Sequence, residues 1–176
     1  MDGSPLQGAA AGLGSAGSTI DKIVGIDPGL RVTGYSILEL RPGRPTILEA
    51  GVIRVKPTQP FEDRLAELFE GIQQVLETDN IVAMALEQVF SHYERPQTAV
   101  LMGHARGVIC LAAALQKVPV FDYAATRVKK LLTGSGRANK VQMQAAICRE
   151  YGLDAPPEPH DVADALAIAT CHYHAM

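Results

Sequence analysis

Two short runs of apolar residues, separated by an amphipathic segment, limit most strongly how this chain can fold. Residues 22–27 and 81–86 are too short for typical helices, and their centres are mostly apolar, as expected of buried strands. Between them, residues 61–78 carry apolar side chains at helical spacing. Because a helical crossover between two strands of one sheet makes them parallel, we expect these two strands to be neighbours.

The rest of the chain predicts an α/β domain with a five-stranded mixed β-sheet flanked by α-helices. Residues 31–40 and 47–55 are rich in β-formers and follow short turns, which indicates an antiparallel meander with the first strand. Residues 118–122 predict a last short strand. We expect residues 1–20, which are mostly Gly, Ala and Ser, to be a disordered extension and residues 21–176 to form one domain. Further helices are expected over residues 97–117, 124–132, 140–151 and 160–174.

Composition excludes several classes of protein. The charged fraction of 20% is ordinary for a folded domain. No continuous apolar run approaches the roughly 18 residues of a membrane helix, and the first residues lack the pattern of a signal peptide. The three widely spaced cysteines indicate neither a disulfide framework nor a metal-binding knuckle. We therefore expect a cytoplasmic protein without a membrane segment.

The net charge of −3 hides an uneven distribution. Residues 123–149 contain six basic and no acidic residues, whereas residues 150–176 contain five acidic and no basic ones. Such a basic block is typical of a surface that binds nucleic-acid phosphates, although a solvated helix face is the alternative. Gly134 and Gly136 would let the backbone approach a phosphate closely. The candidate DNA-binding cations are Arg127, Lys129, Lys130, Arg137 and Lys140.

Four carboxylates are expected to meet at one edge of the sheet. Asp27 ends the first strand, and Glu87 follows the parallel strand that we place beside it. Asp161 and Asp164 occupy the first turn of the last expected helix, three residues apart, so both project from one helix face. The carboxyl ends of parallel strands are where ligand sites form.

Each of these carboxylates also has an ordinary explanation. Asp27 could belong to a turn, Glu87 could be a solvated strand end, and Asp161 could cap the helix with Asp164 as its dipole partner. Clustered together, however, four anions would repel one another, and divalent cations relieve that repulsion. Oxygen ligands favour Mg²⁺ or Mn²⁺, and two such ions can activate water and stabilise the leaving oxygen at a phosphodiester. His160 could face the same site.

Five segments of the chain, taken together, resemble the RuvC family of Holliday-junction resolvases. The resemblance implies a ribonuclease H-like fold, a homodimer and magnesium-dependent, symmetric cutting of four-way DNA junctions in recombination and repair. It also implies the RuvAB branch-migration complex as a partner. The segments are GIDPGLRVTGYSILE (25–39), LEQVF (86–90), GHARGV (103–108), PVFDYAATRVKKLLTGSGRANKVQM (119–143) and HDVADALAIATCH (160–172).

The resemblance further implies roles for individual residues. It places the family's acidic quartet, as catalytic residues and metal ligands, on the four carboxylates named above, and some members have a histidine where this chain has Asp161. The family's base-contacting phenylalanine matches Phe90, for which Tyr93 is a weaker candidate. Its functional lysines match Lys129 and Lys140.

The expected helix over 97–117 carries a stripe of small residues. Ala99, Gly103 and Gly107 are spaced four apart and lie on one helix face. The stripe could pack on the chain's own sheet, or it could pair with its copy in a two-fold dimer that presents two active sites to a symmetric junction. Arg95 and Arg106 are additional candidates for phosphate contact.

Three rival functions can be weighed against the sequence. A nuclease of the same fold could act on RNA–DNA hybrids or pre-ribosomal RNA. A junction-binding protein without catalysis would not need four clustered carboxylates. An actin-like ATPase would need a second nucleotide-binding half, for which we expect no room in this chain.

Overall fold

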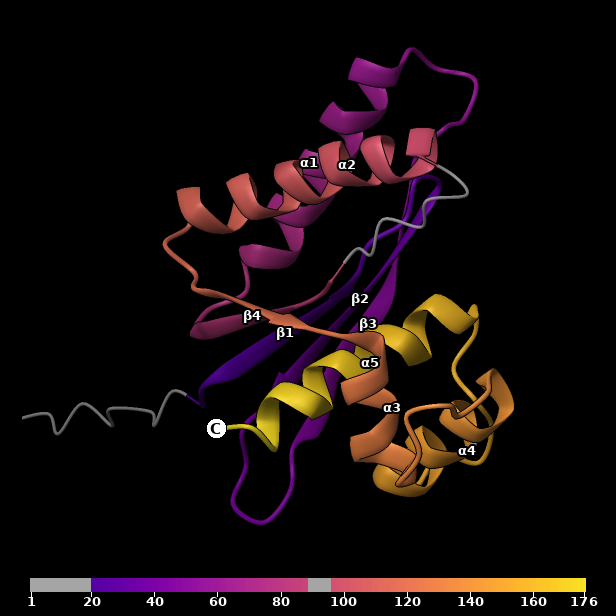
Figure 1. The fold of residues 1–176 in the computed structure, drawn as a ribbon. Helices are drawn as coiled ribbons and strands as arrows, with labels where there is room; N and C mark the ends of the chain where they lie inside the picture. The colour runs from indigo at the N-terminus through magenta and orange to yellow at the C-terminus, as the bar shows by residue number, and fades with distance from the viewer. Residues whose placement is uncertain (1–19, 89–95) are drawn as a thin grey trace, which may run out of the picture.

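The computed structural model describes residues 20–88 and 96–176, which form a five-stranded sheet with helices on both faces (Figure 1). The strand order is β3-β2-β1-β4-β5; β1 is parallel to β4 and β4 to β5, whereas β1–β2 and β2–β3 are antiparallel. The expected meander and the parallel crossover are therefore confirmed. The strands are β1 (Lys22–Asp27), β2 (Val32–Glu39), β3 (Thr46–Arg54), β4 (Ile81–Glu87) and β5 (Val120–Tyr123). The helices are α1 (Phe61–Leu76), α2 (Pro96–Leu115), α3 (Ala125–Thr133), α4 (Lys140–Tyr151) and α5 (His160–Tyr173).

The element boundaries lie within two residues of the expected ones, and β5 shows the clearest difference at its start. This strand begins at Val120 rather than at Val118. Lys117 adopts a left-handed conformation, and the Val118 amide donates to the Ala113 carbonyl, so Val118 completes the end of α2 before the strand begins. Of the extension predicted over residues 1–20, residues 1–19 lie outside the described residues, as do the candidates Phe90, Tyr93 and Arg95.

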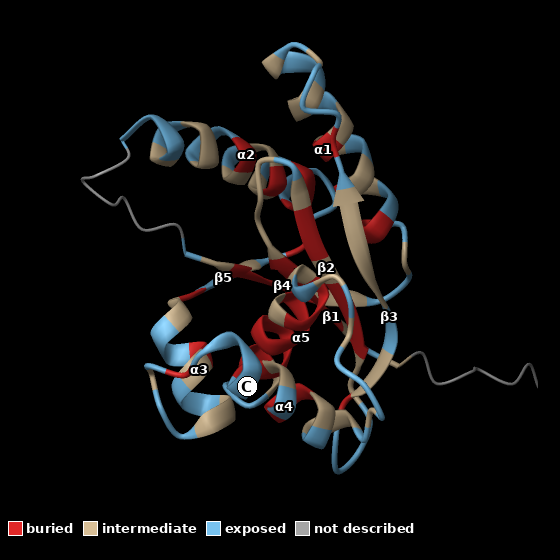
Figure 2. Ribbon diagram, turned by 90° about the vertical axis from the view of Figure 1, so that its right-hand side faces the viewer, coloured by how far each residue is buried: buried red, intermediate tan, exposed pale blue. Residues whose placement is uncertain are grey.

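The sheet separates two hydrophobic clusters, because successive strand residues point to opposite faces. One cluster lies under α1 and α2, and the other lies under α3, α4 and α5. Figure 2 shows that α5 and the middle of the sheet are almost entirely buried. The side chains of β1 and β4 that pack toward α1 and α2 are Val24, Ile26, Met84 and Leu86.

Helix α5 lies unusually close to the sheet because small residues face it. A Cβ atom added to Gly25 would lie 2.7 Å from the Cβ of Ala169, and one added to Gly34 would overlap the Asp161 carbonyl. The Ser36 hydroxyl donates to the Ala165 carbonyl over 3.0 Å, which fixes the helix along β2. These contacts determine where the first turn of α5, with its two aspartates, meets the sheet.

Helix α2 has 20 residues and contains an 18-residue window with a mean hydropathy of 1.6, so by length and composition it could cross a membrane. His104 and Arg106 interrupt the helix, so it contains no continuous apolar run of the length that a membrane helix needs. Core helices can pass the same test. Here Ala105, Ile109 and Ala112 pack in the cluster shared with α1. Its inward face thus belongs to the domain core.

Candidate active site

Side chains along β1 and β4 alternate between the two faces of the sheet, and both strand-end carboxylates lie on the face that α5 covers. Gly25 faces α5, and Asp27, two residues later, shares its face. In β4, Ala85 packs in the cluster under α5, and Glu87 shares its face in the same way. Ile26 pairs with Leu86 in the parallel register, so the two carboxylates leave neighbouring strands at the same level. The prediction that Asp27 and Glu87 lie side by side at one edge of the sheet is confirmed.

The first turn of α5 brings the other two carboxylates to the same place. The helix begins at His160 and its N-cap position is Pro159, so Asp161 is not the capping residue. A Cβ atom added to Gly34, the residue of β2 that pairs with Asp27, would lie 3.2 Å from the Cβ of Asp161, so the first turn of α5 lies near Asp27. The charges of Asp161 and Asp164 both raise the pKa of Asp27. His160 lies at the rim, with a half-exposed side chain whose Nε2 is 3.8 Å from Oδ2 of Asp161.

Burial and mutual repulsion oppose ionisation at this cluster. Burial, together with the charges of Glu87, Asp164 and Asp161, raises the pKa of Asp27 from 3.8 to about 8. Protonated Asp27 can donate a hydrogen bond to Glu87, whose own pKa is raised mainly by burial. Burial also raises the pKa of Asp164, while Lys140 acts in the opposite direction. The cluster therefore favours any ligand that supplies positive charge.

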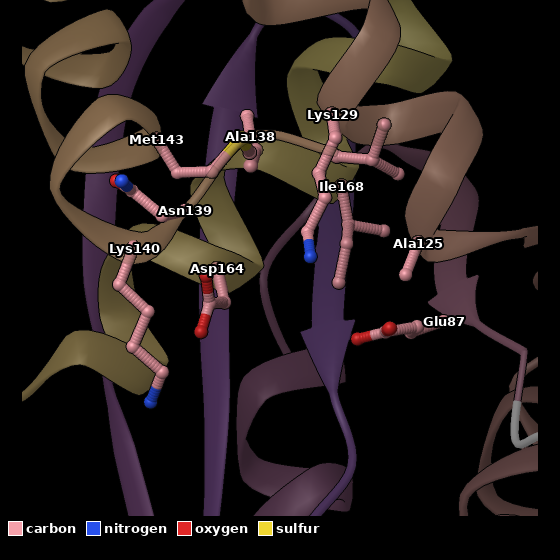
Figure 3. A pocket seen from close by; sticks show the side chains of 11 residues that line it. Glu87, Ala125, Lys129, Ala138, Asn139, Lys140, Met143, Asp164 and Ile168 are labelled. Carbon is pink, nitrogen blue, oxygen red and sulfur yellow. The ribbon is translucent and has the colours of Figure 1, made fainter. Parts of the chain in front are cut away.

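A cavity of about 440 Å³ opens directly beside the carboxylates, between α3, α4 and α5. Glu87 and Asp164 line it together with Lys129 and Lys140. In Figure 3, Asp164 and Glu87 lie on either side of Lys129, and Lys140 lies next to Asp164. Ile168 forms part of the wall behind them. Two anions and two cations thus share one cavity with an apolar interior.

The remaining predicted cations of the basic block do not line this cavity. Arg127 is exposed, and its guanidinium lies 5.0 Å from the centre of the Tyr123 ring. Lys130 and Arg137 are exposed on α3 and on the loop before α4. Gly134 ends α3 with a left-handed conformation, which gives it a structural role that the phosphate-approach hypothesis did not include.

The structure gives Arg106 contacts that sequence reasoning did not anticipate. Its guanidinium donates to the backbone carbonyl of Glu87 over 2.9 Å and forms an ion pair with Asp122. It therefore ties α2 to the ends of β4 and β5, which is a positioning role; its contact with phosphate stays a prediction. Both partners depend on tertiary packing, so no local sequence pattern indicates them.

The small stripe of α2 faces away from the sheet. Gly103 and Gly107 are exposed, and in the part of the chain that the structure describes a Cβ atom added to either would have no neighbour within 4 Å. Packing of these glycines on the chain's own sheet is therefore excluded. They line an open apolar groove of about 480 Å³ together with Leu65, Val100 and Leu111.

The carboxylates fit divalent cations by their chemistry. All four ligand candidates are oxygen donors, as hard ions prefer. Within residues 20–88 and 96–176, no group of three or more Asp, Glu, His or Cys side chains is arranged so that it could hold a metal ion. Mg²⁺ typically takes only one or two protein carboxylates and completes its shell with water and phosphate oxygens. Each ion at this cluster would therefore be held by one or two of the four carboxylates.

Comparison with known proteins identifies the family of this chain. The model of the family "Crossover junction endodeoxyribonuclease RuvC" matches residues 23–172. The chain belongs to the RuvC family. It is 53% identical to RuvC of Rhodopirellula baltica over 152 aligned residues. The alignment covers 86% of this chain and 85% of that protein. It is 43% identical to RuvC of Methylococcus capsulatus, over 87% of this chain and 90% of that protein.

Solved RuvC structures share the fold. The T. thermophilus RuvC in complex with Holliday junction substrate is similar with a TM-score of 0.81 and 30% identity. The similarity covers 88% of this chain and 94% of that RuvC chain. The expected ribonuclease H-like architecture is therefore confirmed, and the RuvC match spans every strand and helix of the domain, apart from the first residue of β1 and the last of α5.

Proposed function

We propose that this chain resolves Holliday junctions by cutting two opposing DNA strands at the cluster of Asp27, Glu87, Asp161 and Asp164. It is a RuvC-family endodeoxyribonuclease, and nucleases of this family depend on divalent metal ions. The observation that carries the site assignment is the convergence of two strand-end and two helix carboxylates beside a cavity with two lysines. Separate elements would not bring four partly buried carboxylates to one edge of the sheet without a ligand for them.

The four carboxylates would hold two Mg²⁺ ions, with Mn²⁺ as an alternative. Bound there, the cations supply Lewis-acid activation of water and stabilise the leaving oxygen of the phosphodiester. The protein's own part is to hold the carboxylates in place. The register of β1 and β4 fixes Asp27 beside Glu87, and the contact with Gly34 sets the first turn of α5 above them.

Lys129 and Lys140 would bind the phosphates of the strand that is cut. Each lines the cavity that the carboxylates share, and each acts electrostatically on Asp164. The exposed Arg127, Lys130 and Arg137 would bind phosphates farther along the junction arms. Phe90 would contact a base near the crossover, a role supported by the family resemblance alone.

The protein would act as a homodimer that cooperates with the RuvAB complex. The groove around Gly103 and Gly107 supports the dimer, because it is apolar, open and able to accept a close helix. Two-fold pairing through α2 would give one active site for each of two opposing strands. The RuvAB partnership is supported by family membership.

A cleavage assay on synthetic DNA tests the proposal. The chain is incubated with a four-way junction, a linear duplex, an RNA–DNA hybrid or a single strand, each with Mg²⁺, Mn²⁺ or EDTA. We expect paired nicks in the junction only, and only with a divalent cation. Asp27→Asn should abolish cleavage while junction binding by gel shift persists. Preferred cutting of the hybrid, or metal-independent cutting, would contradict the proposal.

A further inference from the structure

The interior of the cavity beside the carboxylates has a character that phosphate binding alone does not explain. Its inner wall is built from apolar side chains that belong to the hydrophobic cluster under α5. Val128, Ala138 and Met143 line it, and all three are at least 94% buried, with exposed fractions of 4%, 3% and 6%. The domain core thus opens to the surface beside the catalytic carboxylates.

Charged and apolar groups are separated within this cavity. Lys129, Lys140, Glu87 and Asp164 contribute the polar part, and Ala125 lies at the entrance beside Glu87 (Figure 3). A sugar–phosphate backbone can use the cations and the metal site, but it gains nothing from an apolar wall. Water is also a poor occupant, since apolar walls offer it few hydrogen-bond partners. The ligand that fits has a phosphate at one end and a group with an apolar face at the other.

We propose that the cavity receives one unstacked nucleobase of the strand that is cut, next to the scissile phosphate. The inference rests on the proposed junction-cleaving function, and it assigns a base-binding subsite to the same active site. A phosphate held at the carboxylates carries its nucleoside directly beside this cavity, and 440 Å³ accommodates a base with part of its sugar. The face of the base would pack on the apolar wall formed by α3, α4 and α5.

A junction is a favourable substrate for such a subsite. Removing a base from its stack costs least where pairing is already interrupted, and stacking stops at the crossover of a four-way junction. A base that enters the cavity would also fix the sugar and the phosphate attached to it, so the scissile bond would be oriented at the carboxylates. The subsite therefore links recognition of the crossover to the position of the cut.

Ala125→Leu tests the subsite, because it places a larger side chain at the cavity entrance without changing a charged group. Ala145→Leu makes the same change on the exposed face of α4, away from the cavity, and serves as the matched control. Both variants and the parent are given a junction with all bases present, and junctions with an abasic residue on either side of the mapped cleavage position. Cleavage rates are measured with saturating protein.

We expect the abasic residue on one side to slow the parent about tenfold, the scale of one lost base-stacking contact. Ala125→Leu should cut the intact junction about tenfold more slowly than the parent, and the two should cut the abasic junction at the same rate. Ala145→Leu should match the parent on every substrate. If Ala125→Leu slows the intact and abasic junctions by the same factor, or has no effect, the subsite is refuted.

A fluorescence measurement gives a second readout without cleavage. A junction with 2-aminopurine at the sensitive nucleotide is bound by Asp27→Asn, alone or combined with Ala125→Leu. We expect bright, unstacked 2-aminopurine with Asp27→Asn and weaker emission with the double variant at equal occupancy. Equal emission would overturn the inference. If the parent cuts no junction at all, the proposed function fails; if it cuts and these comparisons show no difference, only the subsite fails.

Discussion

Asp27 shows how one residue can serve function at the expense of stability. Burial and three neighbouring carboxylates raise its pKa to about 8, so between pH 4 and pH 8 the folded chain keeps a proton that the unfolded chain releases. Stability therefore falls as the pH rises through this interval. Active sites commonly carry such unfavourable electrostatics, which their ligands relieve.

The first prediction follows from this loss of stability with rising pH. In EDTA at pH 8, Asp27→Asn should be more stable than the parent by at least about 1 kcal/mol, or about 2–4 °C in melting temperature. The difference should shrink toward pH 4, where both side chains are neutral in the folded state. Thermal unfolding at both pH values measures it, with Asp154→Asn, an exposed aspartate, as the control. Equal melting temperatures at pH 8 would contradict the repulsion described for this cluster.

The lysines of the cavity give a second prediction at the same scale. Lys140→Ala should weaken junction binding and reduce the salt slope of log K by about one unit, because one phosphate contact is lost. Arg44→Ala removes a cation from the exposed β2–β3 turn, at the opposite end of the sheet, and should leave the slope unchanged. Binding titrations at several salt concentrations measure both slopes. An unaltered slope for Lys140→Ala would exclude its contact with phosphate.

At the scale of elements, the position of α5 on the sheet determines the site. The helix carries two of the four carboxylates, and its first turn touches β2 at Gly34, the residue that pairs with Asp27. A side chain at Gly34 would overlap the Asp161 carbonyl and lift that turn. The separation of helix and sheet is therefore part of the catalytic geometry.

Gly34→Ala should consequently damage activity as well as stability. Overpacking should cost about 1–3 kcal/mol, and cleavage should fall at least about tenfold even at a temperature where the variant is folded. Ile72→Val, in α1 on the opposite face, should cost about 0.5–1.5 kcal/mol and keep its cleavage rate there. Circular dichroism and cleavage assays compare the two variants. Full activity of folded Gly34→Ala would show that α5 tolerates the shift.

The sequence predicts the elements and the carboxylates well, for physical reasons. Strand endings, a crossover helix and the spacing of Asp161 and Asp164 are local patterns with few structural solutions. The role of Arg106 was missed because a guanidinium's partners are set by packing between distant segments. The sequence did not reveal whether Gly107 faces the sheet or the solvent, because a helix as apolar as α2 has no clear polar face. The apolar wall at Met143 also depends on how three helices meet.

For the whole molecule, the sheet divides the surface into two working faces. The cavity with the carboxylates lies on the side of α3, α4 and α5, whereas the groove of Gly103 and Gly107 lies on the side of α1 and α2. Pairing two copies through the second face would leave both cavities open to DNA. A substitution in the groove should therefore affect assembly without altering the chemistry at either site.

Gly107→Leu tests this arrangement. A Cβ atom added at this position meets no neighbour within 4 Å among residues 20–88 and 96–176, so the domain should fold normally, but a close helix from a second copy would be obstructed. Sedimentation should show a dimer for the parent and a monomer for Gly107→Leu, with paired nicks replaced by rare single nicks. Ala145→Leu, on α4, should remain dimeric. A Gly107→Leu dimer would place the contact elsewhere on the surface.

The alternation along β1 and β4 also restricts how this gene can change in length. One residue inserted into β1 would turn Asp27 toward α1 and α2 and empty its place beside Glu87. Two inserted residues would restore the face but lengthen the strand by about 6–7 Å. Insertions and deletions should therefore accumulate in the turn over residues 40–45, while the strands that carry the carboxylates diverge by substitution alone.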